Sequence, residues 1–200
     1  MRRLMAAVVA VPLVLLLGVA PVAADTTGGG GSGTHFGSFS ETCSTSSGRQ
    51  VCTDTNLNVD PNGDGTSSGC LDIFTYSVSA KGRFTFMSDN FGCNPDVSLT
   101  VGSDFSVALD PSVISMQTCA AHKRSCSGGA DVTVSASDSL VGDISTTTTR
   151  STTVSGGCTF KTTTKETFGD LAGTMTVDAA TLDEQGFVDI VDETSTVRCK

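Results

Sequence analysis

Residues 43–59 read CSTSSGRQVCTDTNLNV, and this stretch decides the fold. In 51–59 every second residue is aliphatic or β-branched while the residues between are mostly polar, which is the period of a half-buried β-strand. A turn at 47–48 would fold this strand back and set Cys43 directly opposite Cys52. Opposed strand positions bring two Cβ atoms within disulfide reach, so we expect a hairpin closed by a disulfide.

The same period of two continues along the chain. No stretch after the first 35 residues shows the i, i+3, i+4 spacing of an amphipathic helix, and threonine runs at 146–149 and 162–164 favour strands. We predict an all-β protein of short strands arranged as a disulfide-stapled, immunoglobulin-like β-sandwich. The rows expected to point inward are Phe74, Tyr76 and Val78; Phe84 and Phe86; Val97, Leu99 and Val101; Phe105, Val107 and Leu109; Val132 and Val134; Met175 and Val177; and Val188 and Ile190.

The N-terminal residues are expected to lie outside the folded part. Residues 1–24 combine a positive start, an apolar segment at 4–19 and small residues before position 25, which is typical of a cleavable signal peptide. A retained membrane anchor is the alternative, but the apolar segment is shorter than the roughly 20 residues that a spanning helix needs. Residues 25–35 follow as a flexible Gly/Ser-rich linker.

The remaining chain is expected to form two β-rich halves, 36–119 and 120–200, which can also make one domain. Residues 109–114 can be aligned with 177–182, each after a strand of alternating apolar residues. Two related sandwich halves would explain this similarity, and a chance alignment is the alternative.

Eight cysteines follow the signal peptide. An even count behind an export signal indicates four disulfides in an oxidising compartment, so we expect a secreted, extracellular protein. Each bridge contributes about 2–4 kcal/mol by restricting the unfolded chain. The cysteines are Cys43, Cys52, Cys70, Cys93, Cys119, Cys126, Cys158 and Cys199.

Two of the pairs are expected to be local. Besides Cys43 with Cys52, Cys119 with Cys126 closes a six-residue loop. The other four cysteines have no such geometric support, and eight cysteines allow about a hundred connectivities. One arrangement of the other four is Cys70 with Cys93 and Cys158 with Cys199.

Charge limits the classes of partner. Loss of Arg2 and Arg3 with the signal leaves 10 basic and 21 acidic residues, a net charge of −11. Phosphate backbones and anionic membranes repel such a protein, so we expect no nucleic acid partner and no membrane partner after signal cleavage. Trp is absent and Tyr76 is the only tyrosine, whereas stacking platforms for sugars or bases use exposed aromatic rings. The acidity serves either solubility or recognition of a cation or basic partner.

The segment 60–65, DPNGDG, matches the opening of a calcium-binding loop. The twelfth position lacks the expected glutamate, and Asp72 comes one residue later. Two interpretations remain: a polar hairpin turn, because Asn-Gly and Asp-Gly are strong turn signals, or a Ca²⁺ site. In the second case the ligands are Asp60, Asn62, Asp64 and Asp72.

A second candidate is the basic tripeptide His122, Lys123 and Arg124 on the loop between Cys119 and Cys126. A loop held by a disulfide can bind an acidic partner or the specificity pocket of a trypsin-like protease, because it is already ordered. The alternative is an ordinary solvated hairpin tip.

Enzyme motifs are missing from the sequence. The two histidines, His35 and His122, lie at the linker edge and on the basic loop, and no nucleophile-elbow or metalloprotease motif occurs. Acidic clusters at 183–184 and at Asp189 with 192–193 are expected to be solvated strand edges, with a carboxylate glycosidase as the enzymatic alternative.

Several short segments together resemble uncharacterised secreted bacterial β-rich proteins. They are the signal peptide, Gly-Cys at 69–70 leading into 74–76, and the segment 157–160 running to 173–177. The resemblance implies no activity, ligand or site residues.

We therefore expect a non-catalytic binding, adhesion or surface-structural module, for which enzymatic activity is the less favoured alternative. Its partner would be an extracellular protein or glycan, and Ca²⁺ is the only candidate cofactor. The alternatives are a calcium-assisted extracellular binding domain, a carboxylate glycosidase or a protease inhibitor.

Overall fold

Ten antiparallel β-strands make up the part of the chain that this computed structural model describes, residues 32–46, 48–120 and 126–199, and no helix occurs there. The all-β class is therefore confirmed, but the strands are not short, since every strand except β5 has 11 residues or more. The strands are β1 (Gly33–Ser46), β2 (Arg49–Pro61), β3 (Ser67–Ser79), β4 (Phe84–Val97), β5 (Leu99–Val101), β6 (Val107–Ala120), β7 (Ser127–Leu140), β8 (Ser145–Ser155), β9 (Cys158–Val177) and β10 (Ala180–Cys199).

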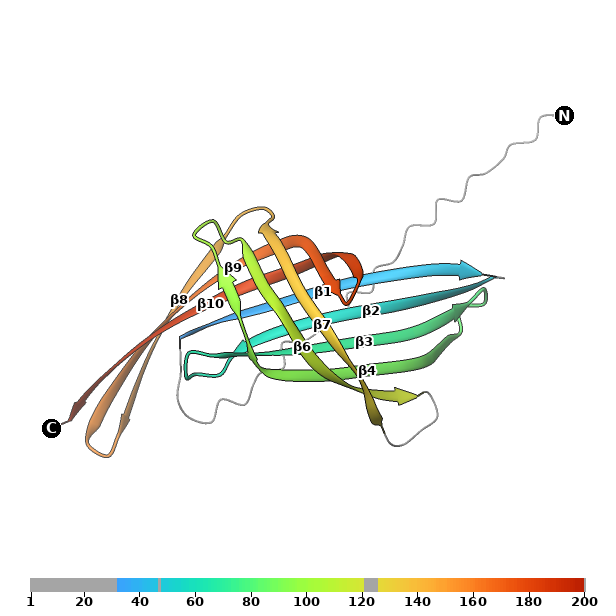
Figure 1. Ribbon diagram of the computed structural model, residues 1–200. Coiled ribbons are helices and arrows are strands. Elements are labelled where there is room, and N and C mark those ends of the chain that lie inside the picture. The colour runs from blue at the N-terminus through green and yellow to red at the C-terminus, as the bar shows by residue number, and fades with distance from the viewer. Residues whose placement is uncertain (1–31, 47, 121–125, 200) are drawn as a thin grey trace. The chain divides into compact units, whose positions relative to one another are not determined.

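All ten strands belong to one sheet, and eight of them form a closed ring (Figure 1). The path β10-β1-β2-β3-β4-β6-β7-β9 returns to β10, because β9 pairs with both β7 and β10. The immunoglobulin-like sandwich is not confirmed, because strands of the two expected halves pair with each other, β1 with β10 and β6 with β7, within a single hydrogen-bonded sheet. β1 also begins at Gly33, which pairs with Val191, so folded structure starts inside the expected linker.

Three strands continue beyond the ring as a ribbon, visible in Figure 1 where β8, β9 and β10 run toward the C-terminus. The pairing of β9 with β7 covers only 171–177, and the pairing of β10 with β1 covers only 185–191. The remaining segments pair with each other and with β8. We call residues 145–168 and 192–199 the arm. All eleven residues of β8 are exposed, so neither face of β8 is covered by the ring.

One hydrophobic core fills the inside of the ring. In β2 the expected alternation is confirmed for 55–59, where Thr55, Leu57 and Val59 are buried, whereas Val51 is half-buried and Cys52, of the opposite parity, is buried. Each buried aliphatic side chain contributes roughly 1.5–3 kcal/mol. The core consists of Phe36, Leu57, Val59, Leu71, Val97, Val107, Leu109, Ile114, Met116, Val134, Ala136, Leu171, Met175 and Val188.

Four disulfides staple neighbouring strands, and the two pairs expected to be local are among them. In three bridges the cysteines are direct cross-strand partners, and the bridge between Cys119 and Cys126 closes the connection between β6 and β7. Four disulfides fit an oxidising, extracellular-type environment. No helix in the described residues is long and apolar enough to cross a membrane. The bridges are Cys43–Cys52, Cys70–Cys93, Cys119–Cys126 and Cys158–Cys199.

Several aromatic side chains expected to point inward lie instead on the outside of the ring. On β3 the core takes Leu71, which is fully buried, whereas Phe74 and Tyr76 have the opposite parity and are only half-buried. Phe84 on β4 is 55% exposed. The prediction for these rows was wrong because aromatic residues suit both faces of a pleated sheet.

An acidic and aromatic sheet face as candidate functional site

One face of strands β1–β4 points away from the core and combines aromatic rings with carboxylates. Asp54 on β2 and Asp89 on β4 lie directly opposite Phe74 on β3. Asp72 and Tyr76 flank Phe74 along β3 itself, because alternate residues of a strand share a face. We call the following set the Phe74 face: Glu41, Asp54, Asp72, Phe74, Tyr76, Phe84, Phe86 and Asp89.

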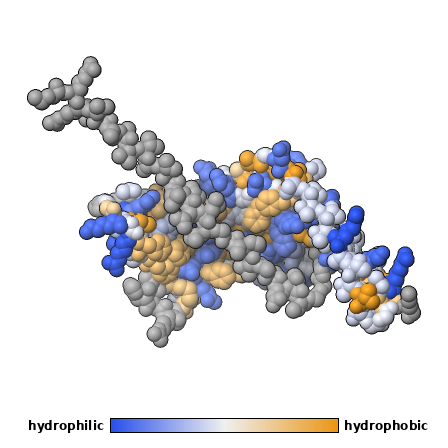
Figure 2. All heavy atoms as spheres, turned by 180° about the vertical axis from the view of Figure 1, so that it is seen from behind, coloured by the Kyte–Doolittle hydropathy of each residue, from blue (hydrophilic) through white to orange (hydrophobic). Residues whose placement is uncertain are grey.

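Four rings of this face pack against one another. The Phe74 ring centroid lies 5.7 Å from that of Tyr76, 6.3 Å from that of Phe84 and 5.3 Å from that of Phe86. The Tyr76 and Phe84 centroids are 5.1 Å apart. These separations are typical of attractive aromatic pairs, which fix the rings relative to each other. In Figure 2 hydrophobic side chains lie at the surface beside hydrophilic ones on the side where β1–β4 run.

Among the described residues, no positively charged side chain pairs with the carboxylates of the Phe74 face. Asp54, Asp72 and Asp89 each have one buried carboxyl oxygen that makes no hydrogen bond. Burial raises the pKa of Asp72 to about 6, with a further contribution from Asp89 beside it. Burial also raises the pKa of Asp54, and the charge of Glu41 adds to this effect. In the described part of the chain the only ion pair joins a histidine to Asp60, well outside this face.

Tyr76 is held in place by Glu41. The Tyr76 hydroxyl donates a hydrogen bond to Oε1 of Glu41 at 2.6 Å. Burial and this hydrogen bond raise the pKa of Tyr76 well above its usual range, so the phenol stays protonated. The hydroxyl therefore keeps donating toward the carboxylate, and the ring stays fixed beside Phe74.

This arrangement suits an organic cation better than a metal ion. Aromatic ring faces attract cations, and nearby carboxylates add charge. Within the described residues, only Glu41, Cys43 and Cys52 bring three metal-ligand atoms within 4.8 Å of one another, and the two sulfurs are joined in a disulfide. Thiolate ligation is therefore excluded at that cluster.

A smaller surface of the same kind lies on β9 and β10. The Phe168 and Phe187 rings have centroids 5.7 Å apart. Asp189 lies directly opposite Phe168, and Asp170 directly opposite Phe187. Burial raises the pKa of Asp189, with a further contribution from the charge of Glu166.

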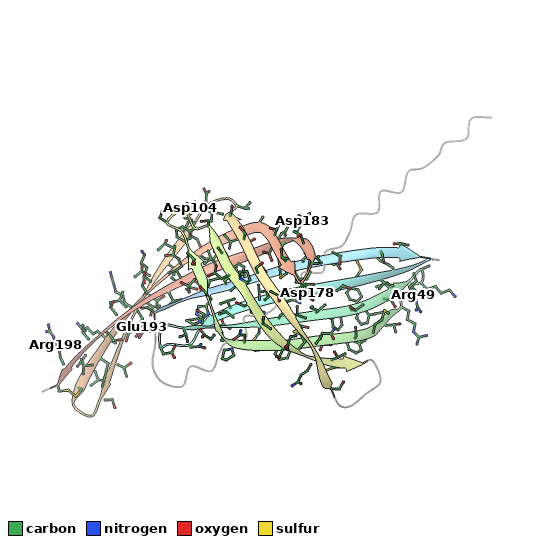
Figure 3. All side chains as sticks on the ribbon, viewed as in Figure 1. Arg49, Asp104, Asp178, Asp183, Glu193 and Arg198 are labelled. Carbon is green, nitrogen blue, oxygen red and sulfur yellow. A yellow bond between two sulfur atoms is a disulfide. The ribbon has the colours of Figure 1, made fainter. Side chains whose placement is uncertain are left out.

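A different pair of carboxyl groups is buried inside the ring. Asp138 on β7 and Glu184 on β10 both lie opposite Gly173 on β9, and they are only 3% and 4% exposed. None of their four carboxyl oxygens has a hydrogen-bond partner. Burial raises the pKa of Glu184 to about 8, with the charge of Asp138 contributing, and burial also raises the pKa of Asp138. The expectation that 183–184 forms a solvated edge is wrong for Glu184 and holds for Asp183, which is exposed and labelled in Figure 3.

The expected calcium ligands do not converge in the structure. Oδ1 of Asp60 lies 2.9 Å from Nδ1 of His35. Asn62 donates to the Thr66 hydroxyl at 2.8 Å, and Oδ1 of Asp64 accepts hydrogen bonds from the Thr66 amide and hydroxyl at 3.0 and 2.6 Å. These contacts are those of a side-chain-stabilised turn, which borders a surface depression of about 370 Å³.

The other expected site residues lie elsewhere. Asp72 belongs to the Phe74 face, between β2 and β4, rather than to the turn. His122, Lys123 and Arg124 lie outside the described residues.

Sequence reasoning missed the Phe74 face, although a signal was present. Phe74 and Tyr76 share their strand parity with Asp72, while Leu71 and Ile73 occupy the other parity. A charged residue in the aromatic row marks it as the solvent side, because a buried unpaired carboxylate is costly.

No protein-family model, curated protein or solved structure matches this chain.

Proposed function

We propose that this protein is a secreted, non-catalytic binding module whose Phe74 face recognises cationic groups, such as lysine and arginine side chains on an extracellular protein. The observation that carries the proposal is a cluster of four packed rings at the surface beside carboxylates that form no ion pair with any described residue. Rings and unpaired carboxylates together make a surface that favours positive charge.

The energetics favour a cation over an apolar ligand. A cation over an aromatic ring gains roughly 0.5–2 kcal/mol, more when it is desolvated. An ammonium or guanidinium group placed over Phe74 could also donate hydrogen bonds to the unpartnered oxygens of Asp54 and Asp89 on either side. A bound positive charge also offsets part of the desolvation cost of these carboxylates, because it stabilises their ionised form.

The scaffold supports such a role. The disulfide-stapled sheet holds the face rigid, so little conformational entropy is lost on binding. As in a β-sandwich, opposite walls of the ring enclose one hydrophobic core, which supports the outer face from behind. The signal-like segment and the four disulfides together support the proposal that the protein is secreted.

The test is binding of a fluorescently labelled hexalysine peptide, measured by anisotropy at low salt. Phe74→Leu should weaken binding by roughly 2-fold to 30-fold, since it removes the ring without changing net charge. The matched control is Phe160→Leu, which removes a 40% exposed ring whose direct partners are Thr153 and Val197. Equal losses in the two variants would contradict the proposal, because generic attraction to an acidic protein would then explain all the binding.

Calcium-assisted binding is the second candidate: the buried oxygens of Asp54, Asp72 and Asp89 have no hydrogen-bond partner, but among the described residues they do not all lie within 4.8 Å of one another, so an ion would require these side chains to move. In this case millimolar Ca²⁺ alone should raise the melting temperature, and Asp72→Asn should abolish the increase. An unchanged melting temperature removes this candidate and leaves the organic cation.

A further inference from the structure

The arm carries a basic face that complements the Phe74 face. Lys161 and Lys165 lie on β9 with Thr163 between them on the same side. Arg150 on β8 is directly opposite Thr163, and Arg198 on β10 is directly opposite Thr159, so all four basic side chains share one face. We call Arg150, Lys161, Lys165 and Arg198 the basic arm face.

This face concentrates the positive charge of the chain. It holds four of the ten basic residues that remain after loss of Arg2 and Arg3. All four side chains are exposed, and none takes part in an ion pair with a described residue. Figure 3 shows Arg198 at the end of the ribbon, away from Arg49 at the opposite end of the described part. Asp192, opposite Lys165, is the only acidic residue on this side of the arm.

Most other residues on this side of the arm are threonines. Thr148 and Thr152 on β8 alternate with Arg150, and Thr194 and Thr196 on β10 precede Arg198 on the same side. Such a flat, hydroxyl-rich sheet surface can approach another sheet closely, since it has no bulky side chains between the charges.

We propose that the basic arm face of one copy docks on the Phe74 face of a second copy of this chain. The proposal rests on the proposed function and names the partner. Four positive side chains would meet the four carboxylates of Glu41, Asp54, Asp72 and Asp89, and lysine or arginine heads would reach the Phe74 ring cluster.

The spacing of the charges fits this contact. Lys161 and Lys165 are four residues apart on one strand, about 13 Å along β9. Asp54 and Asp89 are two strands apart, about 10 Å across the sheet. The long, flexible lysine side chains cover this difference.

The contact is head-to-tail, because two different surfaces meet. In a pair, one copy keeps a free Phe74 face and the other keeps a free basic arm face, so further copies can add at either end. The chain would thus form linear assemblies outside the cell, held largely by charge and therefore sensitive to salt.

Sedimentation velocity of the secreted protein tests the proposal. At about 0.02 M salt the native protein should form species larger than a monomer, which disappear at about 0.5 M salt. K161E/K165E reverses the arm charge, and D54K/D89K reverses the face charge, so each variant alone should be monomeric. An equimolar mixture should associate again, because the acidic arm fits the basic face and the native arm fits the native face. Restored association also shows that both variants are folded.

Other results overturn the proposal. Single variants that associate like the native chain, or a mixture that stays monomeric while both variants keep native melting temperatures, would contradict it. Glu41→Lys, at an exposed position, is the second face variant if D54K/D89K does not fold. If the native chain stays monomeric but binds hexalysine through Phe74, only the proposal of self-association is refuted. A chain that neither associates nor binds hexalysine removes the proposed function as well.

Discussion

The buried carboxyl pair should make the stability of this protein fall as pH rises, and Glu184→Gln should remove a large part of that dependence. The pKa of Glu184 is raised from 4.5 to about 8 in the folded state. Between these pH values the folded state binds more protons than the unfolded state, so the free energy of unfolding decreases with increasing pH. The stability is fully present below the unfolded pKa and is lost as pH rises through the folded pKa.

The magnitude follows from the shift. A shift of one pKa unit changes the free energy of unfolding by about 1.36 kcal/mol, so the full pKa shift of Glu184 corresponds to a loss of roughly 4–5 kcal/mol of unfolding free energy between pH 4.5 and 8. This is a large share of the roughly 5–15 kcal/mol that stabilises a typical domain. The pKa values of Asp72 and Asp138 are also shifted upward, so both groups add to the loss of stability with rising pH.

Urea unfolding at several pH values, with the disulfides intact, measures this effect. The native protein should lose several kcal/mol of unfolding free energy between about pH 5 and pH 9. Glu184→Gln keeps the side-chain shape but cannot ionise, so its pH slope should be much shallower. Asp183→Asn, next along β10 and exposed, is the matched control and should keep the native slope. Equal slopes for the native protein and Glu184→Gln would refute the reasoning.

Two further changes test the packing of the sheet. Gly173→Ala should lower the unfolding free energy by about 2 kcal/mol or more, because the new Cβ would overlap a carboxyl oxygen and a backbone oxygen of β7. The control is Gly128→Ala, whose Cβ would meet no atom within 4 Å and which should be near neutral. Equal losses of unfolding free energy in the two variants would contradict the close approach at Gly173. Replacing both Cys70 and Cys93 with Ala should cost about 3 kcal/mol, since this bridge closes a separation of 23 residues; an unchanged denaturation midpoint would show that the bridge adds nothing.

The sequence was sufficient to predict the local features of the fold. The alternation in 51–59 identified β2 and its buried face, and the turn before it identified the disulfide between Cys43 and Cys52. These features depend on contacts between residues close in sequence, whose geometry the period of two fixes.

Closure of the sheet could not be predicted in the same way. It depends on Gly33 pairing with Val191 and on β9 pairing with two strands, and strand periodicity carries no information about such distant partners. The short-strand expectation failed for a related reason, because polar residues such as those of the arm interrupt the apolar rows without ending the strands.

The burial of Glu184 was predictable but missed. Val188 and Ile190 were expected to point inward, and Glu184 has the same strand parity. Acidic residues usually lie in solvent, and the prediction for Glu184 followed that tendency instead of its strand parity. The structure shows that the parity was the better guide, since Glu184 is buried like Val188. For the Phe74 face the reverse happened: aromatic character outweighed the parity of Asp72.

Reversal of the charge on the Phe74 face tests the central claim most directly. Hexalysine and hexaglutamate binding to native and D54K/D89K proteins can be compared by fluorescence anisotropy at low salt. The account predicts that the native protein binds hexalysine, and that the folded D54K/D89K variant binds hexalysine far more weakly and gains affinity for hexaglutamate. A variant that still binds hexalysine as tightly as the native protein would contradict the assignment of the Phe74 face as the site that recognises cations.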